Sequence, residues 1–261
     1  MKIVVAIDSF KGSLSSIEAG SAAKSGIERA CLADVTVMPL ADGGEGTTEA
    51  LVEGLGGTYV SAVVTGPLGG SVNAVYGILG DGRTAVMEMA RASGIMLVDR
   101  KKLDPSKATT YGVGEMILDA AGRGCREFII GIGGSATTDG GAGMLQALGF
   151  EITDEKGENI RPGIRDLDRI ADITPKNVPK VLKECHFSIA CDVKNPLCGE
   201  NGAVWIYGPQ KGVREEEKDI FDRKMKHFAD KTQEYTGADH RTAPGAGAAG
   251  GLGYAFLSYL P

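Results

Sequence analysis

The segment Gly131-Ile-Gly-Gly-Ser-Ala-Thr-Thr-Asp-Gly-Gly-Ala-Gly143 is the most glycine-rich loop of a predicted strand–loop–helix unit. Residues 127–130 before it form a short apolar run typical of a buried strand, and the apolar residues after it give a brief helical face that Gly149 ends. A glycine-rich turn between a strand and a helix presents backbone N–H groups at a helix N-terminus, where an anion is favoured. Six glycines in thirteen residues exceed what one turn requires, so the stretch is predicted to bind a ligand.

The side chains of this loop agree with an anionic ligand. Its hydroxyls add hydrogen-bond donors, and Asp139 adds a carboxylate suited to Mg²⁺ or to a substrate hydroxyl. The simpler interpretation is a tight turn with Thr138 or Asp139 as an N-cap. The residues assigned to nucleotide or phosphate binding are Gly133, Gly134, Ser135, Thr137, Thr138, Gly140 and Gly141.

Composition limits the class of protein. The net charge of −6 argues against a nucleic-acid partner, and no apolar run is long enough for a membrane span or a signal peptide. The five cysteines lack C-x-x-C spacing, which favours reduced thiols in a cytoplasmic protein over a zinc site. The 39 glycines cluster in loops without a period, which indicates a loop-rich α/β protein.

Two further strand–loop–helix units open the chain. Residues 2–7 are expected to form a buried strand of the parallel-sheet type, followed by Asp8, Ser9 and Lys11, and then by a helix with a Ser15/Glu18 capping box. Ligands of open α/β sheets bind at the carboxyl ends of strands, where these side chains would lie.

The second unit is a strand over residues 35–38, a glycine-bent loop with Asp42 and Glu45, and a helix over 48–55. Helix capping explains one of these carboxylates and leaves the other for a functional role, such as holding Mg²⁺.

Composition then changes. Three β-rich runs separated by glycine turns (58–65, 73–79 and 84–89) indicate a second lobe, with a boundary near Gly66, and Arg91 follows as a candidate anion contact. We therefore expect residues 1–66 to be part of a Rossmann-like α/β lobe and 67–261 to be an inserted α/β lobe.

The rest of the chain repeats the same theme. Residues 111–121 read as a helix, 151–179 as a loop excursion and 203–207 as a short strand. Residues 215–235 read as an amphipathic helix, with a core-facing apolar stripe of Phe221, Met225, Phe228 and Tyr235. A strand over 186–191 runs into Asp192 and Asn195, the third aspartate just past a strand, although an Asx turn before Pro196 would also explain it.

Three functions fit these patterns. Gly131-x-Gly133-x-x-Ala136 with Glu151 twenty residues on fits a dinucleotide fingerprint and an NAD-dependent oxidoreductase, but leaves the carboxylates unused. Phosphoryl transfer needs phosphate-binding N–H groups, cations and metal-holding carboxylates, and it uses all these features. A binding protein without catalysis, the third possibility, would not need several carboxylates at strand ends.

Five blocks together resemble the bacterial glycerate kinase family (type I), and they cover the whole chain. They are Asp8-Ser-Phe-Lys-Gly-Ser13, Pro39-Leu-Ala-Asp-Gly-Gly-Glu-Gly-Thr47, the 131–143 loop, Asp192-Val-x-Asn-Pro-Leu-x-Gly199 and Gly245-Ala-Gly-Ala-Ala-Gly-Gly-Leu-Gly253. The resemblance implies ATP- and Mg²⁺-dependent phosphorylation of D-glycerate, commonly to 2-phosphoglycerate. It also implies two α/β lobes, the second inserted into the first, with the catalytic cleft between them.

Within that expectation, Asp192 is the first candidate for the base that positions the substrate hydroxyl and Asp8 the second, with Lys11 as the catalytic cation. Ser9, Asp42, Arg91 and Asn195 would bind the substrate, and Asp42, Glu45 or Asp139 would hold Mg²⁺. A homodimer is compatible with the sequence. Family members continue past the position of Pro261, so we expect the chain to be a fragment.

Overall fold

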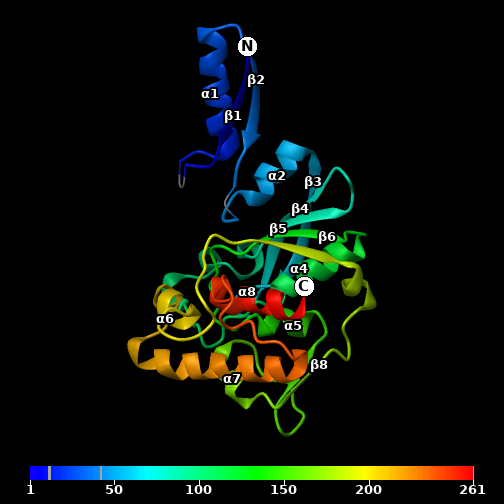
Figure 1. Ribbon diagram of the computed structural model, residues 1–261, viewed down its shortest axis with the longest axis vertical. Coiled ribbons are helices and arrows are strands. Elements are labelled where there is room, and N and C mark those ends of the chain that lie inside the picture. The colour runs from blue at the N-terminus through cyan, green and yellow to red at the C-terminus, as the bar shows by residue number, and fades with distance from the viewer. Residues whose placement is uncertain (11–12, 42, 261) are drawn as a thin grey trace.

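The computed structural model describes residues 1–10, 13–41 and 43–260. A small unit of two strands and one helix projects from a larger body that holds the C-terminus (Figure 1). The small unit consists of β1 (Lys2–Ile7), α1 (Ser16–Ala30) and β2 (Asp34–Pro39). The chain then enters the body through α2 (Thr47–Leu55).

In the small unit, β1 and β2 pair in parallel from Lys2↔Asp34 to Ile7↔Pro39, and α1 covers one face. The helix packs closely, since a Cβ at Gly20 would lie 2.4 Å from Val37 Cγ1. The predicted capping box is confirmed: Ser15 Oγ accepts from the Glu18 backbone N–H, and the Glu18 carboxylate accepts from the Ser15 N–H.

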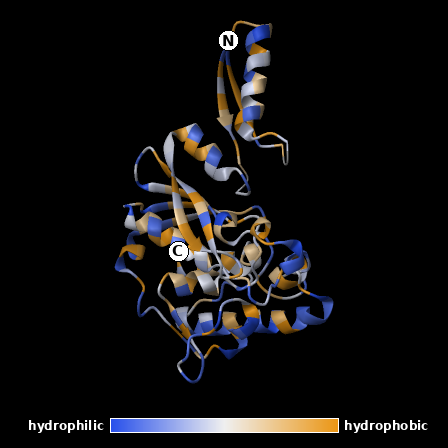
Figure 2. Cartoon of the chain, turned by 180° about the vertical axis from the view of Figure 1, so that it is seen from behind, coloured by the Kyte–Doolittle hydropathy of each residue, from blue (hydrophilic) through white to orange (hydrophobic). Residues whose placement is uncertain are grey.

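The expectation that β1 is buried is wrong. The strand alternates between exposed and half-buried residues, because α1 covers one face and no described element covers the other. Val4 is 60% exposed and Met38 51% exposed, and Figure 2 shows these strands as apolar along much of their length. The residue pattern therefore gave the parallel pairing correctly and the burial incorrectly.

The body is built on a five-stranded sheet with the order β3-β4-β5-β6-β9. Its strands are β3 (Gly57–Thr65), β4 (Ser71–Leu79), β5 (Thr84–Glu88), β6 (Glu127–Gly131) and β9 (His186–Ala190). The first three strands pair antiparallel, whereas β5, β6 and β9 run parallel. The carboxyl ends of β6 and β9 therefore meet at one edge, where the glycine loop and Asp192 follow.

Helices pack around this sheet and bury its apolar residues. Besides α2, they include α4 (Tyr111–Gly122), α5 (Ala142–Ala147), α7 (Lys218–Thr236) and α8 (Ala248–Tyr259). Met87, Phe128 and Ile130 of the sheet are at most 1% exposed, as are Met225 and Phe228 of the predicted α7 stripe. No described helix is both long and apolar enough to cross a membrane.

The predicted lobe boundary near Gly66 falls inside the β3–β4 hairpin, whose strands pair from Gly57↔Leu79 to Thr65↔Ser71. The sheets instead place the change of architecture between β2 and β3. The arrangement of the lobes as an insertion stays a prediction.

Two sequence expectations fail at short elements. Residues 203–207 form a helix, α6 (Ala203–Tyr207), because a five-residue apolar run does not distinguish helix from strand. The expected loop over 151–179 contains an antiparallel pair, β7 (Glu151–Thr153) and β8 (Asp172–Thr174). The remaining elements are α3 (Ala90–Ser93) and the 3₁₀ helices η1 (Ile95–Leu97), η2 (Arg100–Lys102), η3 (Ile164–Arg169), η4 (Lys180–Glu184), η5 (Pro209–Lys211) and η6 (Glu215–Glu217).

Candidate active site

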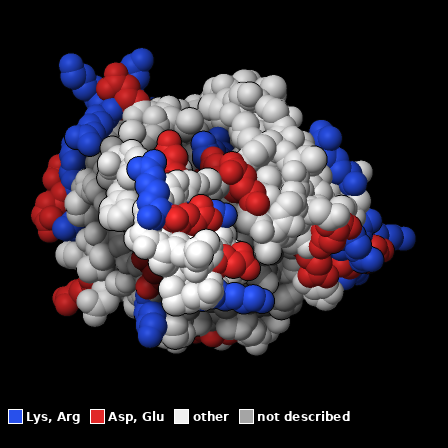
Figure 3. Space-filling model, turned by 90° about the horizontal axis from the view of Figure 1, so that it is seen from above, with Lys and Arg blue, Asp and Glu red and all other residues white. Residues whose placement is uncertain are grey.

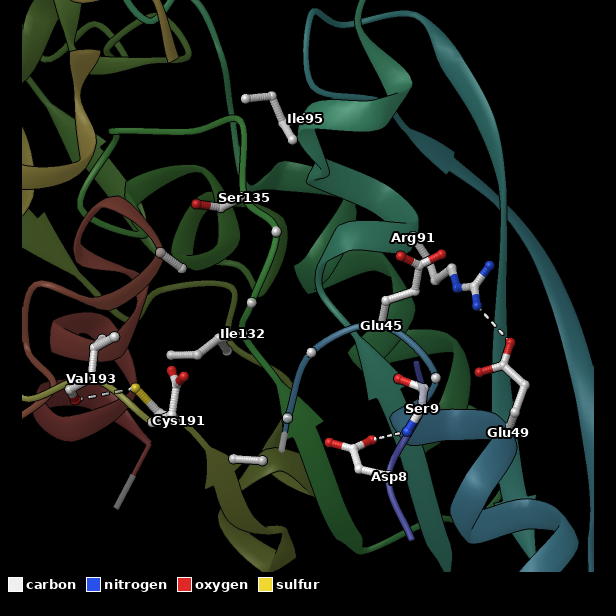
Figure 4. Close-up of a pocket in the computed structure, with 18 of the residues that line it drawn as sticks. Asp8, Ser9, Glu45, Glu49, Arg91, Ile95, Ile132, Ser135, Cys191 and Val193 are labelled. Atoms are coloured by element: carbon white, nitrogen blue, oxygen red, sulfur yellow. Dashed lines mark hydrogen bonds and ion pairs between the residues drawn. The ribbon is translucent and has the colours of Figure 1, made fainter. Parts of the chain in front are cut away.

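A cavity of about 970 Å³ lies where the loops that follow β1 and β2 meet the carboxyl ends of β6 and β9. In Figure 4, Asp8 and Ser9 lie on one side of this cavity and Cys191 and Val193 on the other, with Ile132 and Ser135 between them. The predicted site residues that line it are Asp8, Ser9, Glu45, Arg91, Gly133, Gly134, Ser135 and Asp192. The predicted residues Lys11 and Asp42 lie outside the described part of the chain.

Two close backbone approaches form one wall of the cavity. A Cβ at Gly43 would lie 2.6 Å from the Ala190 carbonyl oxygen, and a Cβ at Gly131 would lie 2.4 Å from the Gly43 carbonyl oxygen. Gly43 also has a φ of +88°, a backbone conformation that favours glycine. The glycines therefore let the loop after β2 lie directly on the ends of β6 and β9, which brings Glu45 into the cavity.

Arg91 lies in the cavity wall and is held by two carboxylates. Its Nη2 lies 2.6 Å from Glu49 Oε1, and its Nε lies 3.4 Å from Glu88 Oε2. Burial raises the pKa of Glu88, whose Oε1 accepts from the Thr48 backbone N–H. Arg91 is thus a positioned cation, and its side chain remains 37% exposed.

The glycine loop divides into two parts. Gly133, Gly134 and Ser135 line the cavity, whereas the later predicted phosphate ligands do not. Thr137 and Thr138 are fully buried. Gly140 and Gly141 lie against the body: a Cβ would come within 2.8 Å of Phe228 Cδ1 at Gly140 and within 2.4 Å of Ala255 Cβ at Gly141.

Asp139 is fully buried beneath the loop and outside the cavity lining. Its carboxylate accepts from the backbone N–H and the hydroxyl of Thr110, at 2.8 and 2.9 Å, and from the backbone N–H groups of Gly141 and Gly143. Burial raises its pKa. These bonds join the loop to the start of α4, a structural contact that resembles neither a solvated cap nor an open metal ligand.

The two predicted site residues that follow β9 also differ in their position relative to the cavity. Asp192 lines the cavity, but Asn195 does not. The Asn195 side chain donates to the Asn201 carbonyl at 2.8 Å and accepts from the Tyr207 hydroxyl at 2.6 Å. Because Tyr207 lines the cavity, Asn195 reaches the site through that tyrosine.

Lys211 is the site residue that sequence reasoning missed. It lies in η5 and lines the cavity, yet it is only 1% exposed. Its Nζ donates to Ser135 Oγ and to the Thr137 carbonyl, both at 2.6 Å. A lysine in Gly208-Pro-Gln-Lys-Gly212, a turn after an apolar run, is the one signal that could have drawn attention to it.

The cavity is lined by charged side chains of both signs, among them Asp8, Glu45, Arg91, Asp192 and Lys211. The face seen from above carries Lys and Arg beside Asp and Glu (Figure 3). Among the described residues, no group of three or more His, Cys, Asp or Glu side chains could hold a metal ion. A metal held mainly by phosphate oxygens needs only one or two protein carboxylates, and the side chains of Asp8, Glu45 and Asp192 line the cavity.

Comparison with known proteins agrees with this architecture. The chain is 48% identical over 261 residues to the glycerate kinase of Bacillus subtilis (strain 168) and to the glycerate 2-kinase of Escherichia coli (strain K12). In both cases the match covers 100% of this chain and 68% of the relative. A crystal structure assigned to glycerate kinase 2 of Salmonella typhimurium LT2 superposes with a TM-score of 0.96 at 46% identity, covering 100% of this chain and 70% of that one.

The family model described as the glycerate kinase family matches residues 3–261, a range that includes every residue found to line the cavity. This chain therefore belongs to the glycerate kinase family.

Proposed function

We propose that the protein is a kinase that transfers a phosphoryl group from ATP to a hydroxyl of D-glycerate, with 2-phosphoglycerate as the product. The observation that carries the proposal is the family match over residues 3–261, together with a cavity in which carboxylates face a glycine loop and a buried lysine. Phosphoryl transfer relies on positioning and electrostatic stabilisation, which this set of groups can supply.

Asp192 is the preferred base and Asp8 the second candidate. Both follow strands that end at the cavity, and both side chains line it. Asp8 Oδ1 accepts from the Ser9 backbone N–H at 2.6 Å, so one of its oxygens is already engaged. A carboxylate at hydrogen-bond distance from the substrate hydroxyl would orient it and accept its proton.

The anionic groups of the substrates would lie against Gly133, Gly134 and Ser135. Backbone N–H groups and a hydroxyl are suited to phosphate oxygens. Glu45, with Asp42, remains the proposed Mg²⁺ ligand, and the metal would offset charge on the phosphates. The four donors that bind Asp139 support a structural role for it in place of metal binding.

Substrate positioning is proposed for Ser9 and Arg91 from the side of the cavity that holds Asp8. The guanidinium of Arg91 is oriented by Glu49 and Glu88, and it would attract the glycerate carboxylate. Asn195 would act indirectly by holding Tyr207 at 2.6 Å.

The test is an ADP-release assay with D-glycerate, with L-glycerate as the stereochemical control and ³¹P NMR to identify the product. Asp192→Asn is expected to lower kcat by roughly 10²–10⁴-fold, the range of general base catalysis. Asp34→Asn is the matched control, because Asp34 pairs with Lys2 at the end of the β1–β2 pair opposite to Asp8. No ADP release with either glycerate would reject the proposal.

The same samples test the oxidoreductase alternative. NADH absorbance with small hydroxy acids would change only if the fingerprint-like segment 131–136 binds a dinucleotide. In the structure α5 begins only at Ala142, eleven residues after β6 ends at Gly131, and buried polar residues occupy the interval. We expect no change in absorbance.

A further inference from the structure

Lys211 places a cation beneath the glycine loop, in contact with the cavity. It ends η5 (Pro209–Lys211), and the turn continues through Gly212, whose φ is +100°. The residue is 1% exposed, although its side chain forms part of the cavity lining beside Ser135. Burying an ammonium is costly unless the group is paired or hydrogen-bonded.

Lys211 Nζ donates two hydrogen bonds to described residues, although a protonated lysine carries three N–H groups. Its Nζ donates to Ser135 Oγ and to the Thr137 carbonyl, each at 2.6 Å. A protonated lysine has a third N–H, for which the described residues provide no acceptor. A buried donor without an acceptor costs free energy that a ligand oxygen would recover.

The charge of Lys211 is a second reason to expect an anion in the cavity. No carboxylate of a described residue forms an ion pair with it, although the field of Asp139 acts on it. The Asp139 oxygens are already bound by Thr110, Gly141 and Gly143. The cavity side is therefore where a compensating negative charge can approach.

We propose that Lys211 is a direct ligand of a substrate anion, donating its third N–H to a phosphoryl or carboxylate oxygen bound over Ser135. The inference rests on the proposed function for the identity of these anions. Lys211 would also hold Ser135 and Thr137 in place, so that the glycine loop and the ammonium meet the same anion.

This contact makes anion binding depend on pH. Burial lowers the pKa of Lys211 to about 7. A bound anion favours the ammonium and raises that pKa, so binding takes up a proton when the pH lies above 7. Affinity is then expected to fall as the pH rises from 7.5 to 9, by up to about tenfold per pH unit for one linked proton.

The other titratable groups of the cavity are not expected to produce this pH dependence between pH 7.5 and 9. Burial raises the pKa of the Cys191 thiol and of the Tyr207 phenol, which favours their neutral forms. The terminal phosphate of a nucleotide, with a pKa of about 6, is already ionised. The other charged groups that line the cavity are Asp8, Glu45, Glu49, Arg91 and Asp192.

The experiment is isothermal titration calorimetry of the full chain with ADP, inorganic phosphate and D-glycerate, at pH 7.5 and 9 and in two buffers of different ionisation enthalpy. Lys211→Met is expected to weaken binding of the contacted anion roughly 30-fold at pH 7.5 and to abolish both the proton uptake and the pH dependence. Lys211→Arg should retain part of the affinity because it retains the charge.

Lys218→Met is the matched control. Lys218 lies seven residues further along, pairs with Glu215 at 2.6 Å, and is outside the cavity lining. The Lys218→Met substitution removes the same charge from the chain and should leave the affinities for ADP, inorganic phosphate and D-glycerate unchanged. A change equal to that of Lys211→Met would reduce the effect to net charge and overturn the inference.

The ligands distinguish the source of the anion. Weaker binding of ADP and phosphate alone assigns a phosphoryl group, and weaker binding of glycerate alone assigns the carboxylate.

Unchanged affinities in Lys211→Met overturn the inference, as does a wild-type protein that binds none of the three anions. If Lys211→Met does not fold, absence of proton uptake by the wild type overturns it. Anion binding with proton uptake but without ADP release would reject the proposed function and retain the anion site.

Discussion

The β1–α1–β2 unit and the five-stranded sheet begin from similar sequences and reach different environments. Both contain runs of β-branched and aliphatic residues with parallel pairing. No residue of β1 is fully buried, whereas four of the five residues of β5 are. The sheet has helices such as α4 and α2 packed on it, whereas the small unit has α1 along one face and only a smaller contact between β2 and α2.

The residue composition of a segment therefore favours a strand, whereas the elements packed against that strand determine how deeply it is buried. An apolar run stabilises the fold only in proportion to the area that another element removes from water. The cavity lies at the junction of the two regions, so its geometry depends on a weakly covered unit held against a well-packed one.

The largest expected effect is in the packed sheet. Phe128 is 1% exposed and stacks on Phe187 with ring centroids 4.9 Å apart. Phe128→Ala removes this packing and leaves a cavity, so the free energy of unfolding from urea titration should fall by about 3–5 kcal/mol. A loss below about 1 kcal/mol would contradict the packing of this face and remove the contrast between the two regions.

Sequence patterns predicted much of this fold because the long elements carry strong periodic signals. Phe221, Met225 and Phe228 of the predicted α7 stripe are buried as expected, whereas Tyr235, its fourth member, is 40% exposed. The patterns failed where a run is too short to show a period, as in α6, and where burial depends on a distant element, as in β1. Neither failure could be repaired from local sequence.

Site residues were predicted well from the ends of the strands and less well from the glycine loop. Asp8 and Asp192 line one cavity because parallel strands place their carboxyl ends together. In the loop, Ser135 and Asp139 look equally available in the sequence, but packing against α4 buries only Asp139 beyond reach of the cavity. Lys211 carried no motif, since its partners are 74 and 76 residues away in the chain.

An intermediate effect is expected at the junction. Gly43→Ala would strain a φ of +88° and place a Cβ 2.6 Å from the Ala190 carbonyl oxygen. We expect a loss of about 2–3 kcal/mol in unfolding free energy and a lower kcat/KM, because the loop that carries Glu45 would move away from β9.

Gly46→Ala separates the two causes. Its φ is +92°, but a Cβ there would meet nothing within 4 Å, so it reports the backbone strain alone, about 1 kcal/mol. Equal losses in both variants would mean that the contact with Ala190 does not hold the two regions together.

The smallest effect is expected on the uncovered face of the small unit. Val4→Thr keeps the shape and β-branching of a side chain that is 60% exposed, so the unfolding free energy should change by no more than about 0.5 kcal/mol. Val35→Thr is the matched control on the covered face, where the side chain is 3% exposed, and burying a hydroxyl there should cost about 1–3 kcal/mol. Urea titration of both variants, with hydrogen exchange of the β1 amides, measures the difference. A loss at Val4 as large as that at Val35 would show that this face is covered in solution. The two regions would then be equally well packed and would differ only in what covers them.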